Sequence, residues 1–318
     1  MGETVGSLGE FGVIDAVSAR LPSGPDVVVG PGDDAAVVAF ADGRAVASTD
    51  VLIEGRHFRR DWSTGLDVGH RGAAASLADI AAMGARTTAL LVGLGAPPEL
   101  PAQWVLDMAD GLREECALVG ASVVGGDVVR SDRVVVSVTA LGTLEGREPV
   151  LRSGARVGDV LALAGRLGYA AAGLSVLSRG FRSPRRLVDA HRRPLPPYDA
   201  GPRAAVAGAS SMIDVSDGLV ADLAHLAVAS GVVVAVESAL LPIGDALAET
   251  ASAFTLDPLT WVLTGGDDHA LVATFGPDVV LPEPFVRIGT VVGPGDSAAG
   301  VLVDGRPHEG VAGHDHFR

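Results

Sequence analysis

Residues 45–50 have the sequence Ala-Val-Ala-Ser-Thr-Asp, a short run of small and β-branched side chains that ends on a carboxylate. Runs of this kind alternate along the chain with longer stretches rich in alanine and leucine, such as residues 67–83. Short β-branched runs are typical of strands, and the longer stretches have the length of helices. The alternation predicts an α/β or α+β fold.

Working outward from that run, we expect strands at residues 27–29, 35–40, 45–49, 133–141, 160–164, 232–236 and 270–275. We expect helices at residues 10–20, 67–83, 102–118, 168–178, 217–229 and 243–250. Gly84 and Gly231 follow two of these helices, and glycine is suited to a left-handed C-cap.

The chain has 318 residues, the length of two domains. We place the domains at residues 1–147 and 148–318, because a turn at Glu145-Gly146-Arg147 follows the long strand of the first half. Residues 179–202 are rich in arginine and proline, and we expect them to form a surface excursion between elements.

Composition narrows the class of protein. The chain is 48% hydrophobic and 20% charged, which excludes a disordered or fibrous protein. Asp and Glu (39) outnumber Lys and Arg (24), and the net charge of −15 disfavours nucleic acid and anionic membranes as partners. One cysteine and no lysine exclude an internal disulfide and a P-loop of the GxxxxGK[ST] type. Without a membrane-length apolar run or a signal-peptide pattern, we expect a soluble, cytoplasmic protein.

Aspartates follow apolar runs and lie beside glycines at five places. These are Gly30-Pro31-Gly32-Asp33-Asp34, Ser48-Thr49-Asp50, Gly125-Gly126-Asp127, Asp214-Val215-Ser216-Asp217-Gly218 and Gly265-Gly266-Asp267-Asp268. Strand ends with glycine turns are where α/β scaffolds place their sites. A single Gly-Asp pair is an ordinary turn. Five such places in a chain without lysine indicate a shared function.

Asp79 gives an independent argument for a cation, because it lies near the negative C-terminal end of the helix expected at residues 67–83. Its neighbours at three and four residues are Ala75, Ser76, Ala82 and Met83. Unless that face is solvated, a carboxylate there requires a positive partner. Carboxylates without cysteine favour Mg²⁺, Mn²⁺ or Ca²⁺, and no calcium loop is present. Since several aspartates would repel a polyphosphate, the pattern predicts a metal–nucleotide site with more than one ion.

Three further residues are candidates for contact with phosphate or substrate. Ser216 is a candidate N-cap for the helix at residues 217–229, whose first N–H groups could hold a phosphate; a plain cap is the alternative. Arg152 could reach phosphate or lie on the surface. His57 follows Asp50 by seven residues, and a lone histidine more often serves packing.

Together the motifs resemble thiamine-monophosphate kinase, a family of the aminoimidazole ribonucleotide synthetase-like superfamily of ATP-binding enzymes. The resemblance extends nearly from end to end. It rests on Gly9-Glu10-Phe11, Gly32-Asp33-Asp34-Ala35-Ala36, Ser48-Thr49-Asp50, His57-Phe58, residues 79–84, Gly125-Gly126-Asp127, Arg152-Ser153-Gly154-Ala155, residues 213–219, Gly265-Gly266-Asp267-Asp268 and Asp315-His316-Phe317.

The resemblance implies ATP-dependent phosphorylation of thiamine monophosphate to thiamine diphosphate, a step of thiamine biosynthesis. It implies a two-domain aminoimidazole ribonucleotide synthetase-like fold whose N-terminal sheet pairs across a homodimer. It implies several Mg²⁺ ions with the ligands Asp34, Ser48, Thr49, Asp50, Asp79, Asp127, Asp214 and Asp217. It implies ATP contacts from Gly126, Asp127, Arg152 and Ser216, and substrate contacts from His57, Asp267 and His314.

The chain departs from the family pattern at several positions. Ser76 replaces Asn, Val128 replaces Thr, Asp267 replaces Glu, His269-Ala270 replaces Tyr-Glu, and His314 replaces Tyr or Trp. None of these departures removes an implied metal ligand. The shorter side chain of Asp267 and the change at His314 affect the implied substrate contacts.

The implied reaction needs no catalytic nucleophile or general base. The second pKa of a phosphate is about 6, so the acceptor is already ionised at pH 7. We therefore expect direct in-line transfer assisted by metal ions, without a phosphoenzyme. The alternatives are another metal–nucleotide enzyme of the superfamily, a two-metal phosphohydrolase, and a non-catalytic Mg-nucleotide binder.

Overall fold

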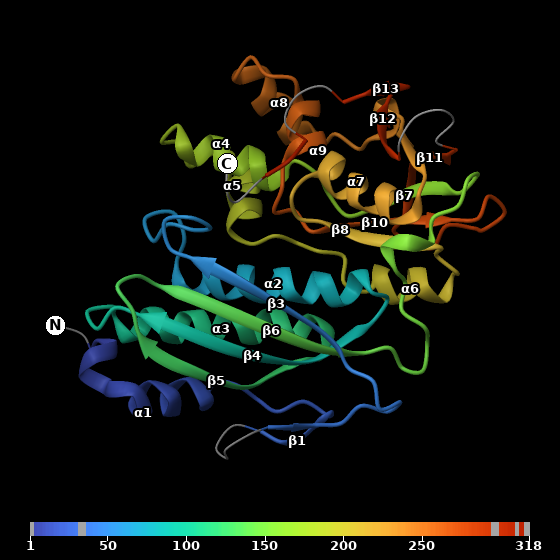
Figure 1. Ribbon diagram of the computed structural model, residues 1–318. Coiled ribbons are helices and arrows are strands. Elements are labelled where there is room, and N and C mark those ends of the chain that lie inside the picture. Colours follow the sequence, from blue (N-terminus) through green and yellow to red (C-terminus); the bar gives the residue numbers. More distant parts are fainter. Residues whose placement is uncertain (1–2, 31–35, 294–298, 309–311, 315–318) are drawn as a thin grey trace. The chain divides into compact units, whose positions relative to one another are not determined.

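The computed structural model describes residues 3–30, 36–293, 299–308 and 312–314. The chain divides into two compact units. Unit 1 comprises Met1–Ile80 and Ala85–Gly146, and unit 2 comprises Ala81–Gly84 and Arg147–Arg318. Each unit contains its own sheet and helices (Figure 1), which confirms the predicted mixed fold. Among the described residues, no helix combines the length and the apolar character needed to cross a membrane.

Unit 1 contains a four-stranded sheet in the order β3-β6-β4-β5 and a small sheet of β1 and β2. Its strands are β1 (Val27–Val29), β2 (Val37–Val38), β3 (Val46–Ile53), β4 (Arg86–Ala96), β5 (Ser122–Arg130) and β6 (Val135–Thr143). Its helices are α1 (Val5–Ser18), α2 (Gly65–Ala82) and α3 (Ala102–Val119), and the last two residues of α2 belong to unit 2. Strands β4 and β5 are parallel, and the other pairs of the larger sheet are antiparallel.

Side chains alternate between the two faces of the unit 1 sheet. In β6, Val136 and Val138 are buried, whereas Ser137 and Thr139 are half-exposed. The buried row faces α2, because a Cβ added at Gly72 would contact both valines. Helices α2 and α3 lie along this face (Figure 1). The alternation is the pattern expected for a sheet that is covered on one face.

Helices α2 and α3 approach one another through glycines. A Cβ added at Gly69 would clash with the carbonyl oxygen of Met108, and one added at Gly111 would clash with that of Leu66. Both obstacles are backbone atoms, which cannot rotate away. The crossing therefore depends on the absence of side chains at these two positions.

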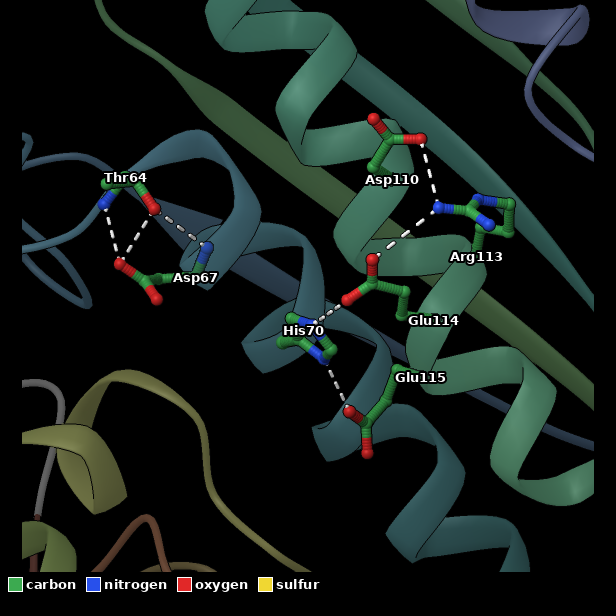
Figure 2. Close-up of polar contacts among 7 residues, drawn as sticks. All are labelled: Thr64, Asp67, His70, Asp110, Arg113, Glu114 and Glu115. Atoms are coloured by element: carbon green, nitrogen blue, oxygen red, sulfur yellow. Dashed lines mark hydrogen bonds and ion pairs between the residues drawn. The ribbon is translucent and has the colours of Figure 1, made fainter. Parts of the chain in front are cut away.

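Polar contacts accompany the α2–α3 crossing (Figure 2). Thr64 and Asp67 form a cap at the start of α2, where Asp67 Oδ2 accepts from the N–H and the hydroxyl of Thr64, both at 2.8 Å. One turn later, His70 lies between two carboxylates of α3. Its Nδ1 is 2.7 Å from Glu115 Oε2, and its Nε2 is 3.1 Å from Glu114 Oε2. The two contacts of His70 tie the first half of α2 to α3.

Unit 2 contains a seven-stranded sheet in the order β13-β12-β9-β11-β7-β10-β8. Its strands are β7 (Val160–Ala164), β8 (Ser211–Val215), β9 (Val233–Val236), β10 (Ala270–Phe275), β11 (Val286–Val292), β12 (Gly300–Val303) and β13 (Arg306–Pro307). Its α-helices are α4 (Tyr169–Ser178), α5 (Arg185–Arg192), α6 (Ala200–Val206), α7 (Leu219–Ser230), α8 (Asp245–Ala253) and α9 (Pro258–Thr264). Two short 3₁₀ helices are η1 (Arg152–Gly154) and η2 (Ser238–Leu240).

Both faces of the unit 2 sheet are covered. In β7, Leu161 and Leu163 belong to a core cluster that also contains residues of α4, α7, α8 and α9. The alternate residues Ala162 and Ala164 belong to a second cluster with residues of α6 and with Ala81 and Ala82. The uninterrupted apolar sequence of β7 fits a strand that is buried on both faces.

The prediction that residues 179–202 form a surface excursion is wrong for the middle of this segment. Residues Arg185–Arg192 form helix α5, in which Leu187 and Val188 are buried. Arg185 and Arg186 of the same helix are exposed. The arginines lie on the exposed face of an amphipathic helix. The arginine-rich composition alone therefore did not reveal that this segment is a packed helix.

Candidate functional site

Two of the predicted metal ligands, Asp50 on β3 and Asp79 on α2, lie between the sheet and the helix of unit 1. The hydroxyl of Ser48 donates a short hydrogen bond to Asp79 Oδ2. The hydroxyl of Ser76 donates to Asp50 Oδ2 at 2.7 Å and to the carbonyl of Val138 at 3.2 Å. The two bonds run in opposite directions between strand and helix and fix both carboxylates. Carboxylate oxygens are the hard donors that Mg²⁺ prefers.

Asp127 lies on the other face of the same sheet. The strand register runs from Asp127 through Gly93 and Ser137 to Val51, the neighbour of Asp50. Strands β5 and β3 are the two edges of the sheet, with β4 and β6 between them. Three strand spacings of about 4.8 Å separate the edges by roughly 14 Å. Within one chain, Asp127 and Asp50 are too far apart to bind the same ion.

The face that carries Asp127 borders a cavity of about 850 Å³. Residues of α1, α3, β5 and β6 line it, among them Gly126, Asp127 and Thr139. Thr49, another predicted metal ligand, is on this face, where its Oγ1 is 3.0 Å from Thr139 Oγ1. Two of the predicted ATP contacts, Gly126 and Asp127, thus belong to the wall of a largely apolar cavity.

The remaining sites predicted for the first half are only partly described. Asp34 lies outside the described residues, and its neighbours Gly30 and Ala36 line the cavity. His57 follows β3, and its Nδ1 accepts the N–H of Ile53 at 2.9 Å. A neutral imidazole that accepts at Nδ1 carries its hydrogen on Nε2. Within the described part of the chain, no three or more His, Cys, Asp or Glu side chains are grouped to hold a metal ion.

In unit 2, five predicted residues form one corner at the start of α7. Asp214 is the next-to-last residue of the buried strand β8, and Ser216 and Asp217 continue into the turn. The N–H of Asp267 donates to the carbonyl of Ser216 at 2.8 Å, and the N–H of His314 donates to the carbonyl of Asp217 at 2.9 Å. Two segments far along the chain, which carry the predicted substrate contacts, are thus held beside two predicted metal ligands.

The sequence predicted Ser216 as the N-cap of this helix, and the structure shows that this prediction is wrong. Helix α7 begins at Leu219 after Gly218, and no side chain of the capping residue closes it. Asp222, one turn into the helix, accepts the N–H groups of Asp217 and Gly218 with the same oxygen, each at 3.0 Å. These two N–H groups are therefore occupied and do not offer the expected phosphate site.

Asp222 was missed by the sequence analysis. Burial, helped by the nearby charge of Asp214, raises its pKa to about 7, although the N–H groups of Gly218 and Asp217 oppose the shift. The available signal was an aspartate in the first turn of an apolar helix. The same argument from an apolar setting that singled out Asp79 applies to it.

Arg152 is not close to Ser216, the other predicted ATP contact in unit 2. Arg152 is exposed in η1, and its carbonyl accepts the hydroxyl of Ser230 at 2.7 Å. Ser230 ends α7, whereas Ser216 precedes its start. A helix of 12 residues is about 18 Å long. The two residues lie at opposite ends of α7.

The loop between α9 and β10 carries three polar side chains, two of them in unusual backbone conformations. Asp267 and His269 have φ angles of 67° and 51°, which non-glycine residues seldom adopt. His269 Nδ1 lies 3.1 Å from Asp214 Oδ2. Between them, buried Asp268 accepts the N–H of Ala170 at 2.9 Å and so caps α4, while its Oδ2 has no hydrogen-bond partner in the described part of the chain.

We expect the substitution Asp268→Asn to stabilise the protein above neutral pH. Burial raises the pKa of Asp268 to about 7, and the N–H groups of Ala170 and Gly168 offset this only in part. An unfolded aspartate titrates near 3.9, so between about pH 4 and pH 7 the unfolded chain loses a proton that the folded chain retains, and stability falls as pH rises. The cost reaches roughly 4 kcal/mol at about 1.4 kcal/mol per pKa unit.

Urea unfolding at pH 5 and pH 8 measures this effect. The advantage of Asp268→Asn over the parent should grow by about 2–3 kcal/mol between the two pH values. Exposed Asp278 provides the control, because Asp278→Asn should show no such change. An equal advantage of Asp268→Asn at both pH values would mean that Asp268 is ionised throughout.

Comparisons with known proteins agree with this architecture. The family model of AIR synthase related protein, N-terminal domain, matches residues 32–144. The thiamine-monophosphate kinase of Mycobacterium tuberculosis is 50% identical over 316 residues, which cover 99% of this chain and 93% of that protein. The structure of thiamine-monophosphate kinase from Stenotrophomonas maltophilia superposes with a TM-score of 0.81 at 31% identity, over 93% of this chain and 96% of that one. The structure of AaThiL complexed with AMPPCP and TMP gives a TM-score of 0.79 at 32% identity, over 97% of both chains.

Proposed function

The chain belongs to the thiamine-monophosphate kinase family, and from this premise we propose that it transfers the γ-phosphoryl group of ATP directly to thiamine monophosphate. The products are ADP and thiamine diphosphate. The observation that best supports a phosphotransferase site in this chain is the pair Asp50 and Asp79, each held by a serine hydroxyl between β3 and α2.

The proposed Mg²⁺ ligands are Asp34, Ser48, Thr49, Asp50, Asp79, Asp127, Asp214 and Asp217. Their chemistry fits, because all are hard oxygen donors and no cysteine accompanies them. These residues would hold Mg²⁺, which would supply positive charge against the repulsion between the two anionic substrates. The hydrogen bonds from Ser48 and Ser76 keep the carboxylates of Asp79 and Asp50 in place for this role.

For ATP, we propose that the cavity of unit 1 takes the nucleoside, beside Gly126 and Asp127. Its wall is mainly apolar, which suits a purine ring. A Cβ at Gly126 would clash with the carbonyl of Val92, so the position requires glycine. Arg152 and Ser216 are proposed as further ATP contacts.

For the acceptor, we propose contacts from His57, Asp267 and His314. Asp267 and His314 are both anchored through their N–H groups to the turn that carries Asp217. The acceptor phosphate is ionised near pH 7, so the protein needs to orient it and to exclude water rather than to remove a proton. No phosphoenzyme forms in this scheme.

We also propose that the active form is a homodimer built on the open face of the unit 1 sheet. That face exposes Val51, Leu91 and Val129, whose exposed fractions are 46%, 38% and 54%. Apolar patches of this kind mark protein interfaces. Because Thr49 and Asp127 lie on this face at opposite edges of the sheet, an arrangement across a dimer would allow Asp127 of the partner subunit to approach Thr49.

The function is tested by supplying ATP, Mg²⁺ and thiamine monophosphate and measuring ADP and thiamine diphosphate. We expect the two products in equal amounts, and we expect loss of both when EDTA removes the divalent ions. Phosphate release at the same rate without the acceptor would instead identify a phosphohydrolase. Labelling of the chain by γ-phosphate-labelled ATP would contradict direct transfer.

A further inference from the structure

Asp214 is a buried carboxylate in which, among the described residues, one of the two oxygens is hydrogen-bonded. Its exposed fraction is 4%, and its Oδ2 is 3.1 Å from His269 Nδ1. Among the described residues, no hydrogen bond reaches its Oδ1. The acidic neighbour Asp222 repels it and itself accepts two backbone N–H groups. An ionised carboxylate in such a place requires a further positive partner.

His269 is held more rigidly than an ordinary loop residue. Its exposed fraction is 8%, its φ angle is 51°, and its N–H donates to the carbonyl of Val215 at 3.0 Å. The next residue, Ala270, pairs with Val215 in the β10–β8 ladder. The backbone of His269 is therefore fixed beside β8, the strand that carries Asp214.

The direction of the bond follows from its chemistry. An ionised carboxylate accepts hydrogen bonds and cannot donate them, so the shared hydrogen is on His269 Nδ1. Groups that hydrogen-bond to one oxygen of a metal-binding carboxylate fix the direction of the other oxygen, and removing such a group typically weakens metal binding.

We propose that His269 is a positioning residue that holds Asp214 Oδ2 so that Oδ1 is presented to a divalent cation. The proposal rests on the proposed function, which makes Asp214 a Mg²⁺ ligand. It assigns a role to a histidine at a position where the family pattern has tyrosine, and it involves no direct contact between His269 and the substrates.

Two variants of the full-length chain separate hydrogen bonding from backbone effects. His269→Asn keeps an N–H donor near the position of Nδ1, and Asn tolerates a positive φ angle. His269→Gly removes the donor and relieves the backbone. The exposed His225 of α7 gives the control His225→Asn. Calorimetric titration with Mn²⁺ alone measures binding without turnover, and the Mg²⁺ dependence of kcat measures it during turnover.

We expect His269→Gly to weaken Mn²⁺ binding by about 10- to 100-fold, and to raise by a similar factor the Mg²⁺ concentration for half-maximal turnover. Saturating Mg²⁺ should restore most of kcat. His269→Asn and His225→Asn should stay within about threefold of the parent. The proposal is overturned if His269→Gly binds Mn²⁺ like the parent, or if His269→Asn is as weak as His269→Gly.

These results are distinguishable from failure of the proposed function. A parent chain that makes no thiamine diphosphate but loses Mn²⁺ binding in His269→Gly would overturn the function and keep the positioning role. A parent chain that makes thiamine diphosphate and is indifferent to His269→Gly in both measurements would overturn the positioning role alone.

Discussion

Replacing Asp50 by asparagine is expected to lower kcat by at least about 10²- to 10³-fold, the usual cost of removing one group that stabilises charge in the transition state. Asn has nearly the same size as Asp, and its carbonyl oxygen can still accept the hydroxyl of Ser76, now 2.7 Å from Asp50 Oδ2. The substitution therefore removes the negative charge offered to Mg²⁺ and leaves the packing between β3 and α2 in place.

Steady-state formation of thiamine diphosphate measures this effect, and urea unfolding checks that the free energy of unfolding stays within about 1 kcal/mol of the parent. Asp132 is exposed in the turn between β5 and β6, and Asp132→Asn provides the control with the same change of charge. If Asp50→Asn keeps more than half of the parent's kcat at the same stability, the metal-ligand role of Asp50 is wrong.

The residue types of the site were predictable because each rests on a local rule. A carboxylate near the end of an apolar helix requires a partner; for Asp79 the sequence predicted a cation, and the structure shows a hydrogen bond from the hydroxyl of Ser48. Gly126 is required by a close backbone approach to Val92. It lies inside β5, so the expected glycine turn at a strand end is wrong for this motif. Rules of this kind need only the neighbouring sequence.

The side of the sheet on which each residue lies was not predictable, because it depends on register between distant strands. Asp50 and Asp127 end similar motifs, yet they lie at opposite edges and on opposite faces of one sheet. One step along a strand reverses the face, so sequence alone cannot say which motifs meet.

The strands show the same contrast between features that follow from local sequence and features that depend on distant strands. Strand β10 lies at residues 270–275, as predicted, because it is a short, almost entirely apolar run. Strand β4, Arg86–Ala96, was not predicted, since Gly93 and Gly95 interrupt its apolar pattern. A Cβ added at Gly95 would lie 3.1 Å from Ser131 Cβ, a tight contact, whereas one added at Gly93 would lie 3.7 Å from Ser137 Cβ, an ordinary one. Close packing, which the sequence does not display, therefore favours glycine at Gly95 but does not account for Gly93.

The crossing of α2 and α3 gives the largest expected effect on stability. Helix α2 carries Ser76 and Asp79 of the proposed site, and Val105 and Met108 of α3 line the cavity. Since the two helices touch backbone to backbone at Gly69, any change in their separation is transmitted to both the site and the cavity. The effect of a side chain at this point is therefore expected on stability and on turnover.

We expect Gly69→Ala to lower the free energy of unfolding by about 3 kcal/mol or more, at or beyond the upper end of typical overpacking, because the added Cβ meets the carbonyl oxygen of Met108 and no rotamer change relieves the clash. Gly72, three residues later in the same helix, is the matched control. Its Cβ would lie 3.4 Å from Val138 Cγ2 and 3.5 Å from Leu52 Cδ1, which is ordinary contact. Replacing a helical glycine by alanine gains up to about 1 kcal/mol, so Gly72→Ala should be neutral or stabilising. Urea unfolding of both variants measures the difference, and equal stabilities would show that α2 and α3 do not approach through Gly69.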